Sequence, residues 1–270
     1  MTGKSIADNI APELPYLRRF ARAMCGSQES GDAFVAQMLE GIIADNTMFR
    51  ADLAPKVALY GAFLKIWNAM PINLSADPKA TTLDASADRR IEQITPRPRQ
   101  AFLLTALEGF KPAEVAAIMN VPVEEAASLA EEAGREIAEQ IAARVMIIED
   151  EPLIALDIEA LVNEIGHTSV GIATTRDEAN TLARSTLPDI ILSDIQLADG
   201  SSGIDAVRDI TKDINVPVIF ITAYPERLLT GERAEPTYLI TKPFQPSMVK
   251  AMVSQALFFA PSTNANPGHG

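Results

Sequence analysis

Cysteine and histidine, which carry much of the chemistry of disulfides and transition-metal centres, are scarce in this sequence. The 270 residues include one cysteine, Cys25, and two histidines, His167 and His269. A single cysteine excludes an internal disulfide and a multi-cysteine metal centre. Two histidines, one of them in a Gly/Pro/Asn-rich tail, nearly exclude a histidine-based metal site.

Long apolar runs are also missing. No stretch of about 18 or more apolar residues occurs, which argues against a transmembrane helix. The first ten residues lack the basic start and apolar core of a signal peptide. We therefore expect a cytoplasmic protein with no membrane partner.

Neither half of the chain has an excess of positive charge. The formal net charge is -13. Residues 1–144 hold 15 basic and 19 acidic side chains, and residues 145–270 hold 8 and 17. Proteins that bind nucleic acid use Lys and Arg to neutralise phosphates. Composition therefore gives no support to DNA as a partner.

Apolar side chains at helical spacing run through the first half and predict an all-α region. Three such stripes begin near Leu14, Phe34 and Val57. Residues 71–90, rich in Pro, Asp, Ser and Thr, break the pattern and predict an exposed linker. Further helices are expected over residues 96–108, 111–119 and 122–143. This short helix, Asn-containing turn and longer helix have helix-turn-helix spacing.

From Val145 the period of the apolar pattern changes. Five short apolar runs alternate with helical stretches, which is typical of a parallel sheet with helices on both faces. The expected strands cover residues 145–148, 168–173, 189–193, 216–221 and 238–240. The expected helices cover residues 152–165, 177–187, 203–210 and 245–259. A Pro- and Asn-rich tail, residues 260–270, is predicted to be disordered.

Polar side chains follow four of these strands. Glu149 and Asp150 follow the first strand and Asp194 the third, while Thr222 and Lys242 follow the fourth and fifth. Parallel sheets bind ligands beyond the carboxyl ends of their strands. Each residue alone has an ordinary explanation, such as a helix cap or a solvated surface position. Their joint occurrence at strand ends favours a single site.

Three carboxylates in one crevice repel each other unless a cation is present, and Mg²⁺ prefers carboxylate and phosphate oxygens. We expect Glu149 and Asp150 to bind Mg²⁺, and Asp194 to be both a ligand and the nucleophile that accepts a phosphoryl group. Thr222 would donate a hydrogen bond to that group and Lys242 would supply a positive charge. A stand-alone metal-dependent phosphatase is an alternative, but neither a substrate-binding loop nor a second catalytic acid is evident.

The second half resembles the receiver domain of two-component response regulators throughout residues 145–259. Four of its motifs match VMIIEDEPLI, PDIILSDIQLADGSSGIDAV, PVIFITAY and YLITKPF. The resemblance implies a flavodoxin-like α/β fold with a five-stranded parallel sheet. It also implies that a sensor histidine kinase or phosphotransferase phosphorylates Asp194. The protein would then be a phosphoacceptor signalling protein rather than an enzyme.

The same resemblance adds the backbone carbonyl of Gln196 to the Mg²⁺ ligands and implies a cis Lys242-Pro243 bond. Three features depart from the receiver pattern, one of them a loop from Leu197 to Ser202 that is longer than usual. The first acid is Glu149, where aspartate is commoner. The position of the switch aromatic holds Leu239, with Tyr238 one residue earlier, so which of them takes part in switching is open.

Between the fourth and fifth strands, residues 223–236 show little apolar periodicity. They contain Pro225, Gly231 and Pro236. Any helix in this stretch would be short or loose, which makes the stretch a candidate moving part.

The first half resembles extracytoplasmic-function sigma factors. Their region two resembles LPYLRRFARAMCGSQESGDAFVAQMLEGII, and their region four, with its helix-turn-helix, resembles ITPRPRQAFLLTALEGFKPAEVAAIMNVPVEEAASLAEEAGREIA. The last helix of region four normally presents Lys and Arg to DNA. Here residues 121–144 hold six glutamates against Arg135 and Arg144. The phosphate backbone repels such a helix, although the glutamates could equally be a solvated face.

A sigma-like half followed by a receiver, with an acidic region-four helix, resembles the PhyR family of general stress response regulators. The expected parts are residues 1–70 (region two), 71–90 (linker), 91–144 (region four with a degenerate helix-turn-helix), 145–259 (receiver) and 260–270 (tail). Because helical pattern gives way to strand pattern almost without a linker, we expect the sigma-like and receiver domains to pack together.

The resemblance implies partner switching by a sigma factor mimic. Phospho-Asp194 would expose the sigma-like domain, which would sequester a NepR-like anti-sigma factor and free an extracytoplasmic-function sigma factor. We expect the unphosphorylated receiver to cover the anti-sigma site. The alternative is a phosphorylation-gated DNA-binding transcription regulator or sigma factor, which would require residues 121–144 to contact DNA.

Overall fold

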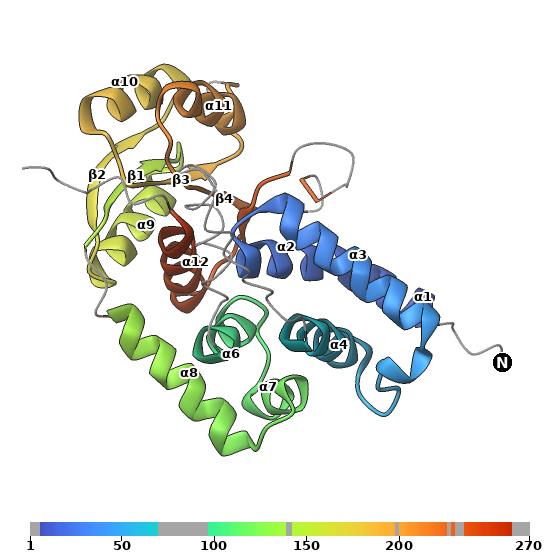
Figure 1. The fold of residues 1–270 in the computed structure, drawn as a ribbon. Helices are drawn as coiled ribbons and strands as arrows, with labels where there is room; N and C mark the ends of the chain where they lie inside the picture. The colour runs from blue at the N-terminus through green and yellow to red at the C-terminus, as the bar shows by residue number, and fades with distance from the viewer. Residues whose placement is uncertain are drawn as a thin grey trace, which may run out of the picture. The chain divides into compact units, whose positions relative to one another are not determined.

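The computed structural model describes residues 6–69, 97–138, 142–197, 200–225, 228–229 and 235–260 (Figure 1). The expected linker and residues 261–270 of the expected tail lie outside the described residues. The chain forms two compact units. One unit is Met1–Ile141 together with Phe220–Met252, and the other is Ala142–Ile219 together with Val253–Gly270.

Helices of the first half bury the predicted apolar stripes. The elements are α1 (Ile6–Ile10), η1 (Ala11–Glu13), α2 (Leu14–Cys25), α3 (Gln28–Ala44), η2 (Asn46–Met48) and α4 (Pro55–Ala69). Gly26, with φ +72°, ends α2 in the left-handed conformation, and the Ser27 side chain caps α3 by accepting the Ser30 N–H. α3 packs against both α2 and α4. The aromatic rings of Phe20, Tyr60 and Phe63 meet in the core between these helices.

The crossing of α2 and α3 is closest at Gly31. A Cβ atom at this position would lie 2.6 Å from the backbone nitrogen of Arg22. Because backbone cannot move aside as a flexible side chain can, glycine is needed for this approach. The crossing also brings Asp32, the next residue of α3, against the arginine side chains of α2.

The predicted helix-turn-helix is present as α6 (Arg97–Ala106), α7 (Pro112–Met119) and α8 (Val123–Ala138). Left-handed backbone at Gly109 (φ +72°) follows α6, and at Asn120 (φ +54°) it ends α7. The expectation that the last helix reaches residue 143 is wrong, because Ala143 already belongs to the sheet region. Its carbonyl accepts the Thr168 N–H at 2.9 Å, and its N–H donates to His167 Nδ1 at 3.2 Å.

The second half contains the predicted five-stranded sheet. The strands are β1 (Arg144–Ile148), β2 (Thr168–Ala173), β3 (Ile190–Asp194), β4 (Val218–Thr222) and β5 (Tyr238–Thr241), in the order β2-β1-β3-β4-β5. This is the flavodoxin-like order, and β1 pairs in parallel with both β2 and β3. β4 begins two residues later than expected because Pro217 has no N–H for the ladder. β3 extends one residue further than expected and ends on Asp194.

The helices between the strands are α9 (Pro152–Glu164), α10 (Arg176–Thr186), α11 (Gly203–Asp213) and α12 (Pro246–Phe259). α9 packs on β1 and β2, while α10 and α11 lie side by side on the opposite face (Figure 1). α11 is longer than the expected 203–210. α10 ends one residue early because Leu187 adopts left-handed backbone, with φ +49°.

Part of the stretch between β4 and β5 is described, and none of its described residues, 223–225, 228–229 and 235–237, is α-helical. The prediction that this stretch moves is not tested by the fold. Among the described helices, none combines the length and the apolar character that crossing a membrane requires.

Candidate functional site

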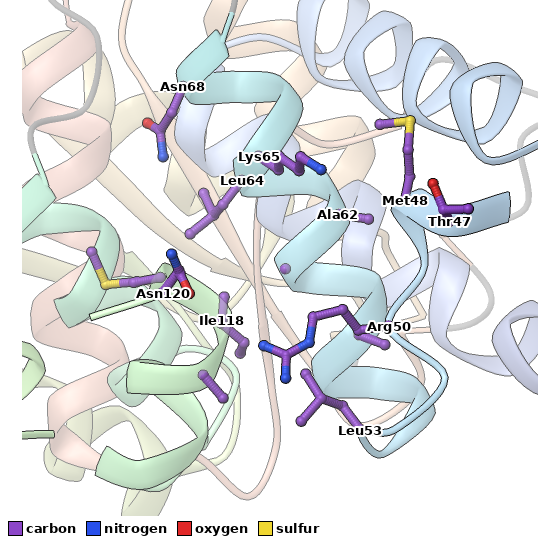
Figure 2. Close-up of a pocket in the computed structure, with 14 residues that line it drawn as sticks. Thr47, Met48, Arg50, Leu53, Ala62, Leu64, Lys65, Asn68, Ile118 and Asn120 are labelled. Carbon is purple, nitrogen blue, oxygen red and sulfur yellow. The ribbon is translucent and has the colours of Figure 1, made fainter. Parts of the chain in front are cut away.

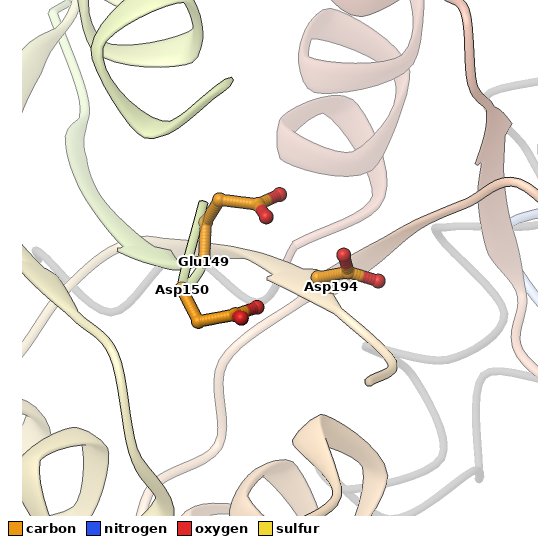
Figure 3. A group of neighbouring side chains, drawn as sticks. All are labelled: Glu149, Asp150 and Asp194. Carbon is orange, nitrogen blue, oxygen red and sulfur yellow. The ribbon is translucent and has the colours of Figure 1, made fainter. Parts of the chain in front are cut away.

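Three acidic side chains lie together beyond the ends of β1 and β3 (Figure 3). Glu149 and Asp150 follow β1 directly, and Asp194 is the last residue of β3. The register of the two strands pairs Ile148 with Ser193, so the residues that come next meet at the same edge. One carboxylate oxygen of each acid lies within 4.8 Å of the others. We call these three residues the acid cluster.

Burial and like charge suit this cluster to a cation. Glu149 is only 1% exposed, and Asp150 and Asp194 are half-buried. Two like charges about 5 Å apart repel by roughly 3 kcal/mol at an effective dielectric constant near 20. Hard carboxylate oxygens are the ligands that Mg²⁺ takes, and a divalent cation would offset the repulsion. The donor set of the acid cluster therefore fits Mg²⁺.

Backbone groups fix the Asp194 carboxylate. The N–H of Ile195 donates to Asp194 Oδ1 at 2.5 Å, and the N–H of Gln196 lies 3.4 Å from the same oxygen. On the main-chain side, the Ser193 hydroxyl donates to the Asp194 carbonyl at 2.8 Å. Gln196 itself is exposed and forms an isolated antiparallel bridge with Ser202. The role of its carbonyl as a metal ligand remains a prediction.

Gly203 is a requirement of this site that sequence patterns did not reveal. It is the first residue of α11, and its N–H donates to the Ile195 carbonyl at 3.0 Å. A Cβ atom on Gly203 would lie 1.8 Å from the Asp194 carbonyl oxygen. α11 can therefore begin directly against the backbone of Asp194 only because this residue has no side chain.

Thr222 and Lys242 lie at the carboxyl ends of β4 and β5. The Lys242 N–H donates to the Thr222 carbonyl at 2.7 Å, and the Lys242-Pro243 bond is cis, as expected. Thr222 is buried, and its hydroxyl accepts the N–H of Tyr224 at 3.0 Å. The structure thus brings Thr222 and Lys242 together with each other. Their predicted approach to Asp194 remains a prediction.

A second cluster of charged side chains was not predicted from the sequence. Arg18 and Arg22 of α2 each bind Asp32 of α3 through two hydrogen bonds, at 3.2 and 3.1 Å for Arg18 and at 2.9 and 2.8 Å for Arg22. Both also bind Glu235, which precedes β5, at 3.2 and 2.5 Å. The side chains of Arg22 and Glu235 are 0% and 1% exposed. We call these four residues the arginine cluster.

The formal charges of the four residues in the arginine cluster sum to zero. Burial opposes ionisation of Asp32, but hydrogen bonds from Arg22 and Arg18 outweigh it and lower the pKa of that carboxyl. The cluster was hard to find because its partners are far apart in sequence, 14 positions from Arg18 to Asp32 and 217 from Arg18 to Glu235. One signal was available: Arg22 falls among the apolar positions of the buried face of α2.

Arg19 forms a separate buried network. It binds Glu108 at 2.8 Å and donates to the hydroxyl of Thr241, the last residue of β5, at 3.2 Å. The Tyr60 hydroxyl donates to the other oxygen of Glu108 at 2.8 Å. Burial, followed by the nearby Glu108 carboxylate, raises the pKa of Tyr60. α2, α4 and β5 thus share one network of buried polar groups.

A cavity of about 340 Å³ lies between α4 and the end of α7 (Figure 2). Arg50, Lys65, Asn68 and Asn120 supply polar groups at its wall, and the rest of the lining is largely apolar. None of its lining residues is acidic, and none of the predicted site residues is among them. The cavity is therefore separate from the predicted phosphoryl and metal chemistry.

Two glutamates of α8 have structural partners. Glu136 pairs with Arg99 of α6 at 3.4 Å, and Glu125 lies 3.8 Å from Arg97. Part of the acidic character of α8 therefore serves its packing against α6. Such pairs leave even less positive charge available to DNA phosphates on this part of the chain.

Comparison with known families accounts for most of the chain. Residues 10–64 match the "Sigma2 domain of PhyR" and residues 91–140 match "Response regulator PhyR, sigma-like domain". Residues 145–254 match the "Response regulator receiver domain". Together with the sheet order, these matches define a response regulator whose receiver follows a sigma-like region.

Relatives that match nearly the whole chain identify the family within this class of response regulators. The phyllosphere-induced regulator PhyR of Methylorubrum extorquens is 51% identical over 266 residues, which cover 98% of this chain and 99% of that protein. The crystal structure of the anti-anti-sigma factor PhyR from Bartonella quintana is 51% identical, with a TM-score of 0.83, and covers 94% of this chain and 96% of that one. The chain belongs to the PhyR family of response regulators.

A co-crystal structure of the Bartonella quintana protein with the anti-sigma factor NepR also matches. Its PhyR chain is 51% identical, the match covers 94% of this chain and 99% of that one, and the TM-score is 0.41.

Proposed function

We propose that the protein is a phosphorylation-dependent anti-anti-sigma factor of a general stress response. Phosphorylation of Asp194 exposes the sigma-like residues 1–144, which bind a NepR-like anti-sigma factor and thereby free an extracytoplasmic-function sigma factor. The observation that carries this proposal is the acid cluster at the strand ends of a receiver in a PhyR-family chain. The relative from Bartonella quintana, itself an anti-anti-sigma factor, supports the choice of partner.

The phosphoryl transfer uses Asp194 as the nucleophile. A carboxylate oxygen of Asp194 attacks the phosphorus of a phosphohistidine, the P–N bond breaks, and the histidine nitrogen leaves with the electron pair and takes up a proton. Lys242 and Thr222 bind the oxygens of the transferring group. Mg²⁺, held by Glu149, Asp150, Asp194 and the Gln196 carbonyl, would supply positive charge for the same oxygens. The protein modifies only itself and turns over no external substrate.

Coupling to the partner requires only a modest change in free energy. In the unphosphorylated protein the receiver, residues 145–259, covers the anti-sigma surface. A preference of a few kcal/mol between covered and open states is enough to redistribute the population. The contacts of α2 with Glu235 and Thr241 support this coupling, because both residues lie within the range that matches the receiver family.

Binding measurements with and without an acyl phosphate test the proposal. Acetyl phosphate with Mg²⁺ is expected to tighten binding of a NepR-type protein by at least about tenfold, which is about 1.4 kcal/mol. Asp194→Asn and addition of EDTA should each remove this effect. Asp157→Asn, which changes an exposed acid of α9, is the matched control and should behave like wild type. Equal tightening of Asp194→Asn by acetyl phosphate would sink the proposal.

No observation favours promoter binding as a second function. The described part of α8 presents five glutamates, of which two are near arginines of α6, and its last turn holds Arg135. Specific binding of duplex promoter DNA at physiological salt would nevertheless overturn this view.

A further inference from the structure

The arginine cluster binds a carboxylate that comes from the stretch predicted to move. Glu235 lies at the end of residues 223–236, next to β5. Its N–H donates to the Gln28 side chain at 2.9 Å, and its carboxylate binds Arg18 and Arg22. The two arginines, Asp32 and Glu235 together carry no net charge. Glu235 is thus the group that completes the charge balance.

Asp32 holds the arginines in place independently of Glu235. Each guanidinium uses its Nε and one terminal nitrogen on Asp32, a geometry that fixes the plane of the group. The close crossing at Gly31 fixes the backbone on which Arg22 and Asp32 stand. Arg22 Nη1, which Asp32 does not use, faces Glu235, whereas Arg18 Nη2 is shared between Asp32 and Glu235. The binding geometry for a carboxylate therefore persists when Glu235 departs.

Departure of Glu235 alone would leave one uncompensated positive charge. Arg22 is fully buried and Arg18 is 21% exposed, so water can solvate this charge only in part. Leaving one member of a buried charged group without its partner is strongly unfavourable. A second carboxylate relieves this cost, whereas a neutral or basic side chain does not.

We propose that the arginine cluster is a carboxylate-exchange site, where an Asp or Glu side chain of the anti-sigma factor replaces Glu235. This inference rests on the proposed function and names the chemistry of its partner contact. Guanidinium groups preset on Asp32 recognise the planar carboxylate. Glu235 then acts as an internal competitor, so its loss strengthens binding of the partner even without phosphorylation.

Two variants distinguish competition by Glu235 from recognition of the partner carboxylate by Arg18. The dissociation constant of each variant is measured without phosphodonor. The partners are NepR from Bartonella quintana and the NepR-type protein of the organism that encodes this chain. Glu235→Gln is expected to bind at least about tenfold more tightly than wild type, because the competitor is lost. Adding Arg18→Gln to Glu235→Gln is expected to weaken binding again by about tenfold, because the partner carboxylate loses one of its two arginines.

Controls keep the test specific. Arg50→Gln in the Glu235→Gln background makes the same charge change at an exposed arginine paired with Asp52, and should leave binding unchanged. Arg18→Lys in the same background keeps the charge but not the planar group. Its affinity for the partner should lie between that of Glu235→Gln and that of Glu235→Gln with Arg18→Gln. This milder variant also decides the outcome if Arg18→Gln does not fold.

Three outcomes decide the inference. Equal affinities of Glu235→Gln with and without Arg18→Gln would show that Arg18 does not contact the partner, which overturns the exchange site and leaves the proposed function intact. No binding by any form would overturn both. An Arg18 effect without any response to acetyl phosphate would support the exchange site and contradict the phosphorylation coupling.

Discussion

The two charged clusters of this protein are built on opposite principles. The acid cluster gathers three like charges within 4.8 Å, and its donor set fits a cation from solution. The arginine cluster balances Arg18 and Arg22 against Asp32 and Glu235, so the protein supplies every charge itself. A cluster of like charges indicates the charge of its ligand directly. A balanced cluster can conceal a binding site, because an internal side chain already fills it.

The glycines beside the clusters give the largest expected effect. Gly203→Ala places a Cβ against the Asp194 carbonyl, and Gly31→Ala places one against the Arg22 backbone. Each should lower the free energy of unfolding by about 3 kcal/mol, the upper end for overpacking, because backbone cannot yield. Urea unfolding measures this. Gly134→Ala, with nothing within 4 Å of its Cβ, should instead be neutral or stabilising.

The two glycine variants should also differ in how fast Asp194 is phosphorylated. Gly203→Ala should slow phosphorylation by acetyl phosphate, whereas Gly31→Ala should leave the chemistry of Asp194 unchanged. If the two variants impaired phosphorylation equally, the acid cluster would not depend on the local approach of α11.

Removing one acid from the balanced cluster gives the next largest effect. Asp32→Asn leaves Arg18 and Arg22 with a single carboxylate, and should destabilise the protein by about 2 kcal/mol. Asp52→Asn removes an acid from the exposed pair with Arg50 and should stay within about 0.5 kcal/mol of wild type. Chemical unfolding of both variants provides the measurement. Equal effects would mean that burial adds nothing to the Asp32 contacts.

Titration of Asp32 follows the same logic. Its folded-state pKa is lowered, so the unfolded chain binds the proton more readily. The stability that Asp32 contributes is present above its unfolded pKa, about 3.9, and is lost as pH falls through the lower folded pKa. Asp32→Asn should remove this contribution to acid unfolding.

The same type of substitution in the acid cluster should have the opposite sign. In the absence of divalent metal, Asp150→Asn relieves repulsion from Glu149 and Asp194 and should stabilise the protein by about 1 kcal/mol. Millimolar Mg²⁺ should raise the thermal unfolding midpoint of wild type but raise that of Asp150→Asn much less. Destabilisation of the metal-free variant would mean that repulsion among the three acids does not limit the stability of the protein.

A histidine outside both clusters gives the smallest expected effect. Burial lowers the pKa of His167, whose neutral Nδ1 accepts the Ala143 N–H. The unfolded chain therefore binds this proton more readily, and stability should fall as pH drops below about 6.5, by a few tenths to about 1 kcal/mol. His167→Asn should flatten this dependence in urea unfolding at pH 7.5 and 5.5. An unchanged slope would assign the pH dependence to groups other than His167.

Local pattern predicted most of the fold and the acid cluster. Changes in the period of the apolar pattern located the strands. Parallel strands that end on acids bring those acids to one edge of the sheet, and Glu149, Asp150 and Asp194 could therefore be grouped. Helix ends were less predictable. The sequence predicts that the last sigma-like helix extends through Ala143, because alanine fits a helix. The hydrogen-bond partners of the Ala143 backbone, His167 and Thr168, lie 24 and 25 residues onward.

The arginine cluster could not be predicted, because its energy comes from long-range pairing. Nothing in the sequence near Arg22 indicates that Glu235 will lie against it, and a buried arginine reads locally as an interruption of an apolar stripe. Gly203 escaped notice for a similar reason. Its requirement arises from the approach of α11 to Asp194, which the sequence pattern does not express.

The proposed function and the carboxylate-exchange site together predict that phosphorylation of Asp194 releases Glu235 from the arginine cluster and so strengthens binding of the anti-sigma partner. The most direct test is the dissociation constant of the NepR-type partner, measured with and without acetyl phosphate, in wild type and in Glu235→Gln. We predict that phosphorylation tightens binding at least about tenfold in wild type and changes it much less in Glu235→Gln, because the variant has already lost the competitor. The same ratio in both proteins would mean that phosphorylation does not act through Glu235.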